Sequence, residues 1–223
     1  MTASISSVDD AARSDVIDDF LSASELENAR KVFARLPFTL GHSTVEPHFD
    51  GPIMRGPGRT ITEVDLSGLP PLFTTLWTAV LGHPLAPKAP ANSIEFRCNW
   101  WQFPPGSGSD WHDDGGEARA VAFILYLHEE WNASWGGGLI ASEWDMGRVA
   151  AFSADTPRPG SVGYAMTASR APARYVVPVP NRLVLLKSPT PHRVEPVHPR
   201  AGDRTRNTIT GFVRVREEQP LDG

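Results

Sequence analysis

The chain has 223 residues, 40% of them hydrophobic, which suffices for one well-filled core and is rather long for two independent ones. A formal net charge of -5 argues against a general nucleic-acid binder, because phosphate binding needs a concentrated basic face. A single cysteine, Cys98, excludes an intramolecular disulfide framework. We expect one domain over residues 15–223 behind a flexible leader of residues 1–14, with no nucleic-acid partner.

The N-terminus lacks the basic start and apolar core of a signal peptide, and no stretch reaches the roughly 20 apolar residues that span a bilayer. The sequence therefore predicts a soluble, cytoplasmic protein with no membrane partner.

Two helices are predicted in the first half of the chain. Ser22 and Glu25 form a capping-box signature, and apolar residues at helical spacing follow it. A second run extends from Leu69 to Val80, with two prolines in its opening turn. Between them, residues 38–62 are punctuated by Gly and Pro, which is typical of a loop with at most one edge strand.

From residue 94 onward the sequence consists of short runs of β-branched and aromatic residues bounded by turn residues. The predicted strands are IEFRCNWWQF, AVAFILYL, GLIAS, RVAAF, RYVVPV, RLVLLK and TITGFVRVR. Two early helices followed by these strands indicate an α+β, mainly β chain whose sheets form a sandwich or barrel such as a jelly roll.

Three residues could hold a metal ion. His112 is followed two positions later by Asp114, and in extended backbone such residues project to the same side. His192 follows the predicted strand RLVLLK. Two imidazoles and one carboxylate form the facial triad that favours Fe(II) and leaves positions open for a keto acid and dioxygen. A zinc-dependent hydrolase could use the same ligands, with a separate general base and no keto acid.

A keto acid would need an anchor for its far carboxylate, and the planar fork of arginine can bind that group bidentately. Arg206 begins the last predicted strand, and Thr208, two residues on, could add a hydroxyl donor from the same face. Each element alone has an ordinary reading as a strand or surface residue. The ordered combination of ligands and anchor favours an oxygenase over a hydrolase or a binding protein without turnover.

The stretch WHDDGGEARAVAFILYLHEEWNASWGGGLIA, from Trp111 to Ala141, resembles the core of the prolyl 4-hydroxylase-like 2-oxoglutarate oxygenases. The later stretches PNRLVLLKSPTPHRVEPV and RTRNTITGF resemble the family's distal-histidine and arginine segments, so the similarity covers about residues 94–215. The resemblance implies a double-stranded β-helix, Fe(II) on the residues matching His112, Asp114 and His192, and 2-oxoglutarate on the one matching Arg206. In such enzymes the keto acid and O2 yield succinate and CO2 while an unactivated C–H bond is oxidised, and ascorbate is a candidate reductant.

The chain departs from the family pattern where a tyrosine often binds 2-oxoglutarate. Here the corresponding stretch is Asn99-Trp100-Trp101-Gln102, so we expect Asn99 or Trp101, with Gln102 as a further candidate, to line the cosubstrate site. The carboxylate of Asp114 favours hydroxylation, or another oxidation, over the halogenation carried out by relatives that lack it.

A second departure is the segment 153–174, which is longer than the family's connection and rich in Pro, Ala, Ser and Arg. It is interpreted as a lid or specificity loop, or equally as a tolerated surface excursion.

The substrate class is predicted from charged residues and from analogy with the family. Arg55, Arg59 and Arg97 could attract an anionic substrate, and Asp113 or Glu95 could meet an amine. We expect a small molecule, such as an amino acid or a natural-product intermediate. A prolyl residue in a protein is the alternative, by family analogy alone. A homodimer is left open.

Overall fold

The computed structural model describes residues 13–41, 51–114, 119–152 and 162–216. In these residues two antiparallel sheets face each other, one of seven strands in the order β1-β9-β6-β11-β4-β3-β2 and one of four strands in the order β5-β10-β7-β8. The strands are β1 (Ser14–Ile17), β2 (Thr39–Leu40), β3 (Met54–Ile61), β4 (Ile94–Phe103), β5 (Ser109–His112), β6 (Arg119–Tyr126), β7 (Leu139–Ser142), β8 (Ala173–Val176), β9 (Leu183–Lys187), β10 (His192–Val194) and β11 (Arg206–Val215). The helices are α1 (Ala23–Phe33), α2 (Pro71–Leu81), α3 (Met146–Phe152) and α4 (Val162–Ser169), with short 3-10 turns at Glu63–Gly68, Ala91–Ser93, Ala133–Trp135 and Pro199–Ala201.

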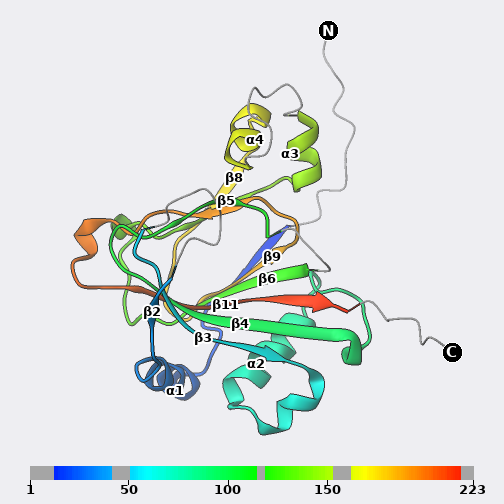
Figure 1. Cartoon of the computed structure of the whole chain (residues 1–223), viewed down its shortest axis with the longest axis vertical. Helices are drawn as coiled ribbons and strands as arrows, with labels where there is room; N and C mark the ends of the chain where they lie inside the picture. Colours follow the sequence, from blue (N-terminus) through cyan, green and yellow to red (C-terminus); the bar gives the residue numbers. More distant parts are fainter. Residues whose placement is uncertain (1–12, 42–50, 115–118, 153–161, 217–223) are drawn as a thin grey trace, which may run out of the picture.

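The molecule is layered around the seven-stranded sheet (Figure 1). Helices α1 and α2 cover one face of this sheet, the four-stranded sheet lies over the other face, and α3 and α4 sit beyond the smaller sheet. One apolar cluster fills the space between the helices and the large sheet, and a second fills the space between the two sheets. This is the jelly-roll arrangement predicted from the sequence.

Both predicted helices are confirmed. The hydroxyl of Ser22 accepts a hydrogen bond from the Glu25 amide at 3.3 Å, while the Glu25 carboxylate accepts one from the Ser22 amide at 3.0 Å, so the capping box starts α1 as expected. Helix α2 begins with Pro71 at its first position, where the missing amide proton costs nothing.

Strand β11 shows why the large sheet can serve two purposes. Ile209 and Val213 belong to the helix-side core, whereas Arg206 and Thr208 project to the other face. Successive residues of a strand alternate between faces, so one strand supplies both a core and a site. The register pairs Thr208 with Trp101 of β4, which places the site candidates of the two strands side by side.

One predicted strand is wrong. RVAAF, residues 148–152, lies in helix α3. The Asp145 carboxylate accepts a hydrogen bond from the Arg148 amide at 2.7 Å and thereby supplies a helix start, and Val149 is fully buried against Ala165 and Met166 of α4. Packing against a second helix, which a short apolar run does not reveal, decides this segment.

The expectation that both helices precede the strands is also wrong, because β1 precedes α1 and β2 and β3 lie between the two helices. The candidate lid over residues 153–174 falls partly outside the described residues, and its described part forms α4 and the start of β8. Most of the leader also lies outside them. No helix in the described parts of the chain is both long and apolar enough to cross a membrane.

Candidate metal centre

His112 and His192 meet across two neighbouring strands. They are direct register partners in the antiparallel pair β5 and β10, and their ring centroids lie 4.2 Å apart. The Asp114 carboxylate reaches both rings, with Oδ2 3.2 Å from His192 Nε2 and Oδ1 3.8 Å from His112 Nε2. The three ligand atoms all lie within 4.8 Å of one another, as a group that could hold a metal ion.

The backbone at Asp114 brings its carboxylate to the two rings in an unexpected way. Strand β5 ends at His112, and Asp114 has a φ of 50°, in the left-handed region that few non-glycine residues adopt. The expected extended geometry of the His-x-Asp stretch is therefore wrong. The left-handed backbone of Asp114, and not strand alternation, directs the carboxylate.

Both imidazoles are oriented by the carbonyl two residues earlier in the chain. His112 Nδ1 donates to the Asp110 carbonyl at 2.6 Å, and His192 Nδ1 donates to the Thr190 carbonyl at 2.8 Å. A carbonyl only accepts, so the Nδ1 atoms carry the protons and the Nε2 atom of each ring is the one available to a metal ion.

The electrostatics of the three groups suit a cation. Burial by itself favours the neutral acid of Asp114, but the hydrogen bond from His192 and the charges of His192, His112 and Arg119 together outweigh it and lower the pKa of Asp114. Burial likewise opposes a charge on His192, but Asp114 outweighs that effect and raises the pKa of His192. When His192 is protonated, its Nε2 carries a second proton beside Asp114. His192 must release that Nε2 proton before a metal ion can bind there.

A cavity of about 570 Å³ opens beside the three ligands. Its walls come from β3, β4, β6, β9 and β11 of the large sheet and from β5 and β10 of the small one. Among the predicted site residues, those that line it are Arg55, Asn99, Trp101, His112, Asp113, Asp114, His192 and Arg206. The structure thus brings the three candidate metal ligands and the cosubstrate candidates Arg206, Asn99 and Trp101 to one pocket, whereas Thr208 is not among the described residues that line it.

Arg206 is a buried cation with an incomplete set of partners. Its residue is 1% exposed, and its guanidinium donates to the Tyr126 hydroxyl at 3.4 Å and lies against the rings of Phe103 and Tyr126. Within the described residues, no acidic group pairs with Arg206, and Arg206 Nε and the buried Thr208 Oγ1 have no hydrogen-bond partner. A buried charge of this kind needs an anion, and a carboxylate is suited to it.

The predicted substrate residues divide into two groups. Arg55 lines the cavity, donates to Asn99 Oδ1 at 3.2 Å and lies over the Trp101 ring, and Asp113 lines the cavity as well. Arg59 instead lies over the Phe73 ring of α2, and Arg97 is 3.8 Å from the Glu95 carboxylate. Neither Arg59 nor Arg97 is among the described residues that line the cavity. Gln102 is not among them either.

Sequence reasoning missed several residues of the pocket. Thr210 and Phe212 line it because they continue the face of Arg206 and Thr208 along β11, a signal that alternation alone would have provided. Arg119 donates to the Asp114 carbonyl at 3.3 Å and lies over the Phe212 ring. Tyr126 is not among the described residues that line the pocket, but its hydroxyl accepts a hydrogen bond from Arg206.

The donor set fits Fe(II). Two neutral imidazoles and one carboxylate are the ligands that the ion uses in non-haem oxygenases, where the remaining positions are left to molecules other than the protein. The buried Arg206 lines the same cavity, where its guanidinium is available to an anion.

Comparisons with known proteins agree with this geometry. The sequence model of the 2OG-Fe(II) oxygenase superfamily matches residues 98–214. Among solved structures, the chain is similar to a prolyl-4-hydroxylase of Pseudomonas putida (22% identity, TM-score 0.55, 92% of this chain and 94% of the other). It is also similar to a prolyl hydroxylase of Trichoplax adhaerens in complex with a hypoxia inducible factor peptide fragment (17%, 0.60, 95% and 88%). A third is EvdO2 of Micromonospora carbonacea var. aurantiaca (16%, 0.55, 95% and 91%).

At these identities the solved structures show a shared fold and nothing finer. No curated protein matches the chain. The superfamily model, however, spans more than half of the 223 residues. The chain therefore belongs to the 2OG-Fe(II) oxygenase superfamily, and it is a dioxygenase that uses Fe(II) and 2-oxoglutarate.

Proposed function

We propose that this protein hydroxylates an unactivated C–H bond of a small molecule, an amino acid or a natural-product intermediate, with release of succinate and CO2. In this proposal residues 15–223 act as one catalytic domain. His112, Asp114 and His192 hold the metal, and Arg206 anchors 2-oxoglutarate. The observation that carries it is the buried Arg206 guanidinium, which has no acidic partner in the described chain and shares a cavity with the three ligands.

Arg206 and Thr208 would bind the far carboxylate of 2-oxoglutarate. Arg206 Nε and Thr208 Oγ1 are donors without partners among the described residues, and β11 places them on one face, two residues apart. Charge-assisted hydrogen bonds from an arginine fork are strong and directional. The guanidinium lies against the rings of Phe103 and Tyr126, and these contacts would orient its donors before the ligand arrives.

Asn99 and Trp101 would flank the bound keto acid. Both project from β4 into the cavity, whereas Trp100 between them packs in the helix-side core. Fe(II), when bound, supplies the activation of O2 that is coupled to oxidation of the keto acid. The protein itself would orient the metal ion through the fixed imidazoles and the keto acid through the fixed guanidinium of Arg206. The apolar walls of the cavity between these two ends would exclude water.

The cavity supports a small and anionic substrate. Its volume of about 570 Å³ lies within the range of about 300–1,000 Å³ that small-molecule sites occupy. Arg55 and Arg119 bring positive charge to its lining, in addition to the Arg206 already assigned to the keto acid. A carboxylate on the substrate would complement these groups.

Hydroxylation of a prolyl residue in a protein or peptide is the second candidate. It draws support from the shared fold with two prolyl hydroxylases, one of them solved with a peptide. Fold likeness at such low identity is analogy, so this candidate ranks below the small molecule.

Anaerobic addition of Fe(II) and 2-oxoglutarate tests the site. We expect a weak visible charge-transfer band that requires both components. Tight zinc binding without such a band would contradict the proposal. A screen of amino acids, carboxylated metabolites and proline-containing peptides, read out as succinate formation with a mass gain of one oxygen atom, then separates the two substrate classes.

A further inference from the structure

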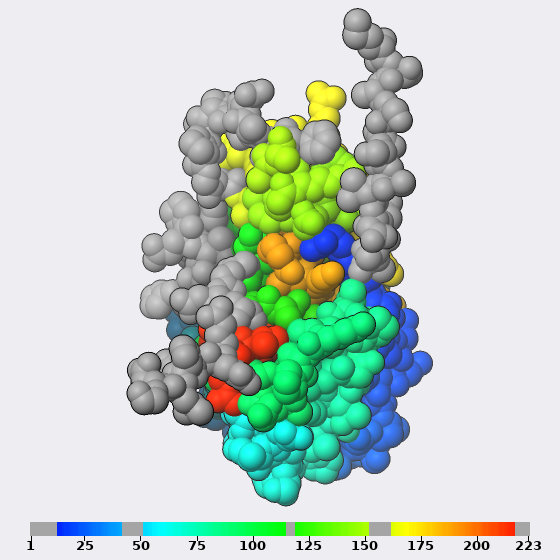
Figure 2. Space-filling model, turned by 90° about the vertical axis from the view of Figure 1, so that its right-hand side faces the viewer, coloured from blue at the N-terminus to red at the C-terminus, as the bar shows by residue number. Residues whose placement is uncertain are grey.

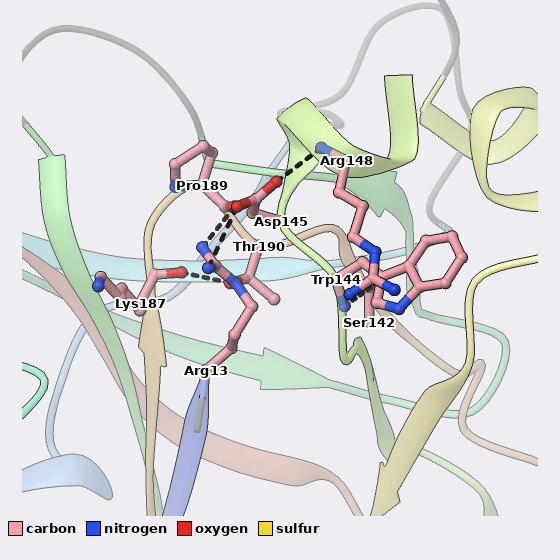
Figure 3. Close-up of polar contacts among 8 residues, drawn as sticks. All are labelled: Arg13, Ser142, Trp144, Asp145, Arg148, Lys187, Pro189 and Thr190. Atoms are coloured by element: carbon pink, nitrogen blue, oxygen red, sulfur yellow. Dashed lines mark hydrogen bonds and ion pairs between the residues drawn. The ribbon is translucent and has the colours of Figure 1, made fainter. Parts of the chain in front are cut away.

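Arg13, the residue before β1, lies far in sequence from the site and close to it in space. Its backbone carbonyl accepts a hydrogen bond from the Lys187 amide at 2.9 Å, which extends the pairing of β1 with β9 by one residue. Its side chain then reaches past the end of β9 toward the segment 188–191, which leads directly to His192 (Figure 3).

The Arg13 guanidinium makes three contacts, two with the segment 188–191 and one with the residue before α3. Nε donates to Thr190 Oγ1 at 3.1 Å, Nη2 donates to the Pro189 carbonyl at 3.3 Å, and Nη1 donates to Asp145 Oδ2 at 3.4 Å. The Arg13 side chain is 18% exposed and the Asp145 side chain 43%, so the contacts with Thr190 and Asp145 are partly buried while the one with the Pro189 carbonyl lies at the surface. In Figure 2 the blue start of β1 touches both the orange segment that follows β9 and the yellow-green surface of α3.

Thr190 connects this guanidinium to the metal centre. Its hydroxyl accepts a hydrogen bond from Arg13 and donates one to the Lys187 carbonyl, and the residue is only 1% exposed. Its backbone carbonyl accepts the Nδ1 proton of His192 and so sets the orientation of that ring. Partners that orient a metal-bound histidine govern metal affinity even when they do not touch the ion.

Asp145 joins the helical pair α3 and α4 to the same point. One of its oxygens accepts from the Arg148 amide at the start of α3, and the other accepts from Arg13 (Figure 3). The Met146 amide adds a hydrogen bond to the Pro189 carbonyl at 3.3 Å. The segment that presents His192 is thus held from two sides, by β1 and by α3.

We propose that Arg13 is a positioning residue for the metal centre, which acts through Thr190 to fix the orientation of His192. The proposal rests on the proposed function, since it takes His192 as a metal ligand. It assigns to the N-terminal segment a role in metal affinity beyond closing the edge of the sheet.

The test is the dissociation constant for Co(II), measured anaerobically by calorimetry on full-length protein without 2-oxoglutarate. Arg13→Met keeps the apolar stem and removes every donor. We expect its dissociation constant to rise roughly tenfold, at the lower end of the effects known for outer-shell partners. Thr190→Val should cause a similar rise. The double variant should bind Co(II) no more weakly than either single variant, because both substitutions break the same chain of contacts.

Asp18→Asn is the matched control. Asp18 lies just after β1 and accepts two hydrogen bonds from Arg182, at 2.6 and 2.9 Å, so this pair also anchors β1 but at the end away from His192. We expect Asp18→Asn to lower the melting temperature as Arg13→Met does, with a Co(II) dissociation constant within about twofold of wild type.

The outcomes are distinct. An Arg13→Met protein that loses thermal stability but binds Co(II) as the control does would overturn the proposal, as would effects of Arg13→Met and Thr190→Val that multiply in the double variant. If Arg13→Met did not fold, Thr190→Val alone would decide, since an unchanged affinity in it contradicts the route through Thr190. Wild-type protein without Co(II) binding would instead contradict the proposed metal site itself, and this proposal with it.

Discussion

The two faces of the seven-stranded sheet are built from the same strands and follow opposite rules. The face toward α1 and α2 carries a large apolar cluster, with fully buried side chains such as Ile61, Phe96 and Val213. The face toward the small sheet buries Arg206 and Thr208 among its apolar residues and leaves polar atoms of both without partners in the described chain. One face stabilises the fold, and the other gives up stability to keep a ligand site ready.

The largest effect is expected from Asp114→Ala on the site face. Loss of an outer-shell partner alone typically weakens metal binding by about 10–100-fold, so loss of the carboxylate ligand should cost roughly a hundredfold or more and stop succinate formation. The unfolding free energy of the metal-free protein should change little. Fe(II) titration and denaturant unfolding check this, with the exposed Glu129→Ala as control; retained Fe(II) affinity would remove Asp114 from the ligand set.

Phe96→Ala makes the opposite change on the helix face. Phe96 is fully buried and stacks on Phe123 at a centroid distance of 4.6 Å. Its truncation should lower the unfolding free energy by about 3–5 kcal/mol. The Fe(II) affinity of the protein that stays folded should match wild type. A parallel loss of metal affinity would show that the two faces are not independent.

Arg206→Leu makes the site face resemble the helix face, because it replaces a buried cation with an apolar side chain. We expect the dissociation constant for 2-oxoglutarate to rise roughly a hundredfold, since the charge-assisted bonds to the keto acid are lost. Metal binding should persist, and the unfolding free energy of the ligand-free protein should not fall, because a buried charge without an acidic partner disappears. Loss of metal would assign Arg206 to the metal centre instead. Arg206→Lys, which keeps the charge without the fork, should be intermediate.

The smallest effect concerns His128, which lies next to the Arg206 partner Tyr126. Burial lowers the pKa of His128 to about 4, and its Nε2 donates to the Pro178 carbonyl at 2.6 Å. The unfolded chain, with an ordinary histidine pKa near 6.5, takes up the proton first, so the stabilising contribution is complete above about pH 6.5 and declines as the pH falls toward about 4.

The size of this effect can be measured by urea unfolding. Between about pH 7.5 and about pH 5, His128 should account for a loss of roughly 2 kcal/mol of unfolding free energy. His128→Asn should show a correspondingly flatter dependence on pH. Identical slopes in wild type and variant would mean that His128 is accessible to protons in the folded state.

Local patterns identified most of the elements in advance. The capping box at Ser22 predicted α1, and the run of β-branched and aromatic residues in 94–103 predicted β4, because each signal depends on neighbours within a few positions. The strand prediction for RVAAF was wrong because the helical state of this segment depends on residues outside it, namely Asp145 and the residues of α4 against which it packs. Arg59 and Arg97 were candidates by charge alone, and charge does not say which face of a strand carries a side chain.

The sequence by itself determined which groups are available: two histidines, a carboxylate, and an arginine at the start of the last strand, in an order that resembles the oxygenase family. Only the tertiary structure decided how they meet. The register of β5 against β10, the left-handed backbone at Asp114 and the contact of Arg13 with Thr190 are features of the folded chain, and the last of them joins residues 177 positions apart. Side-chain chemistry is a property of each residue, whereas coordination and positioning depend on distances that long-range packing sets.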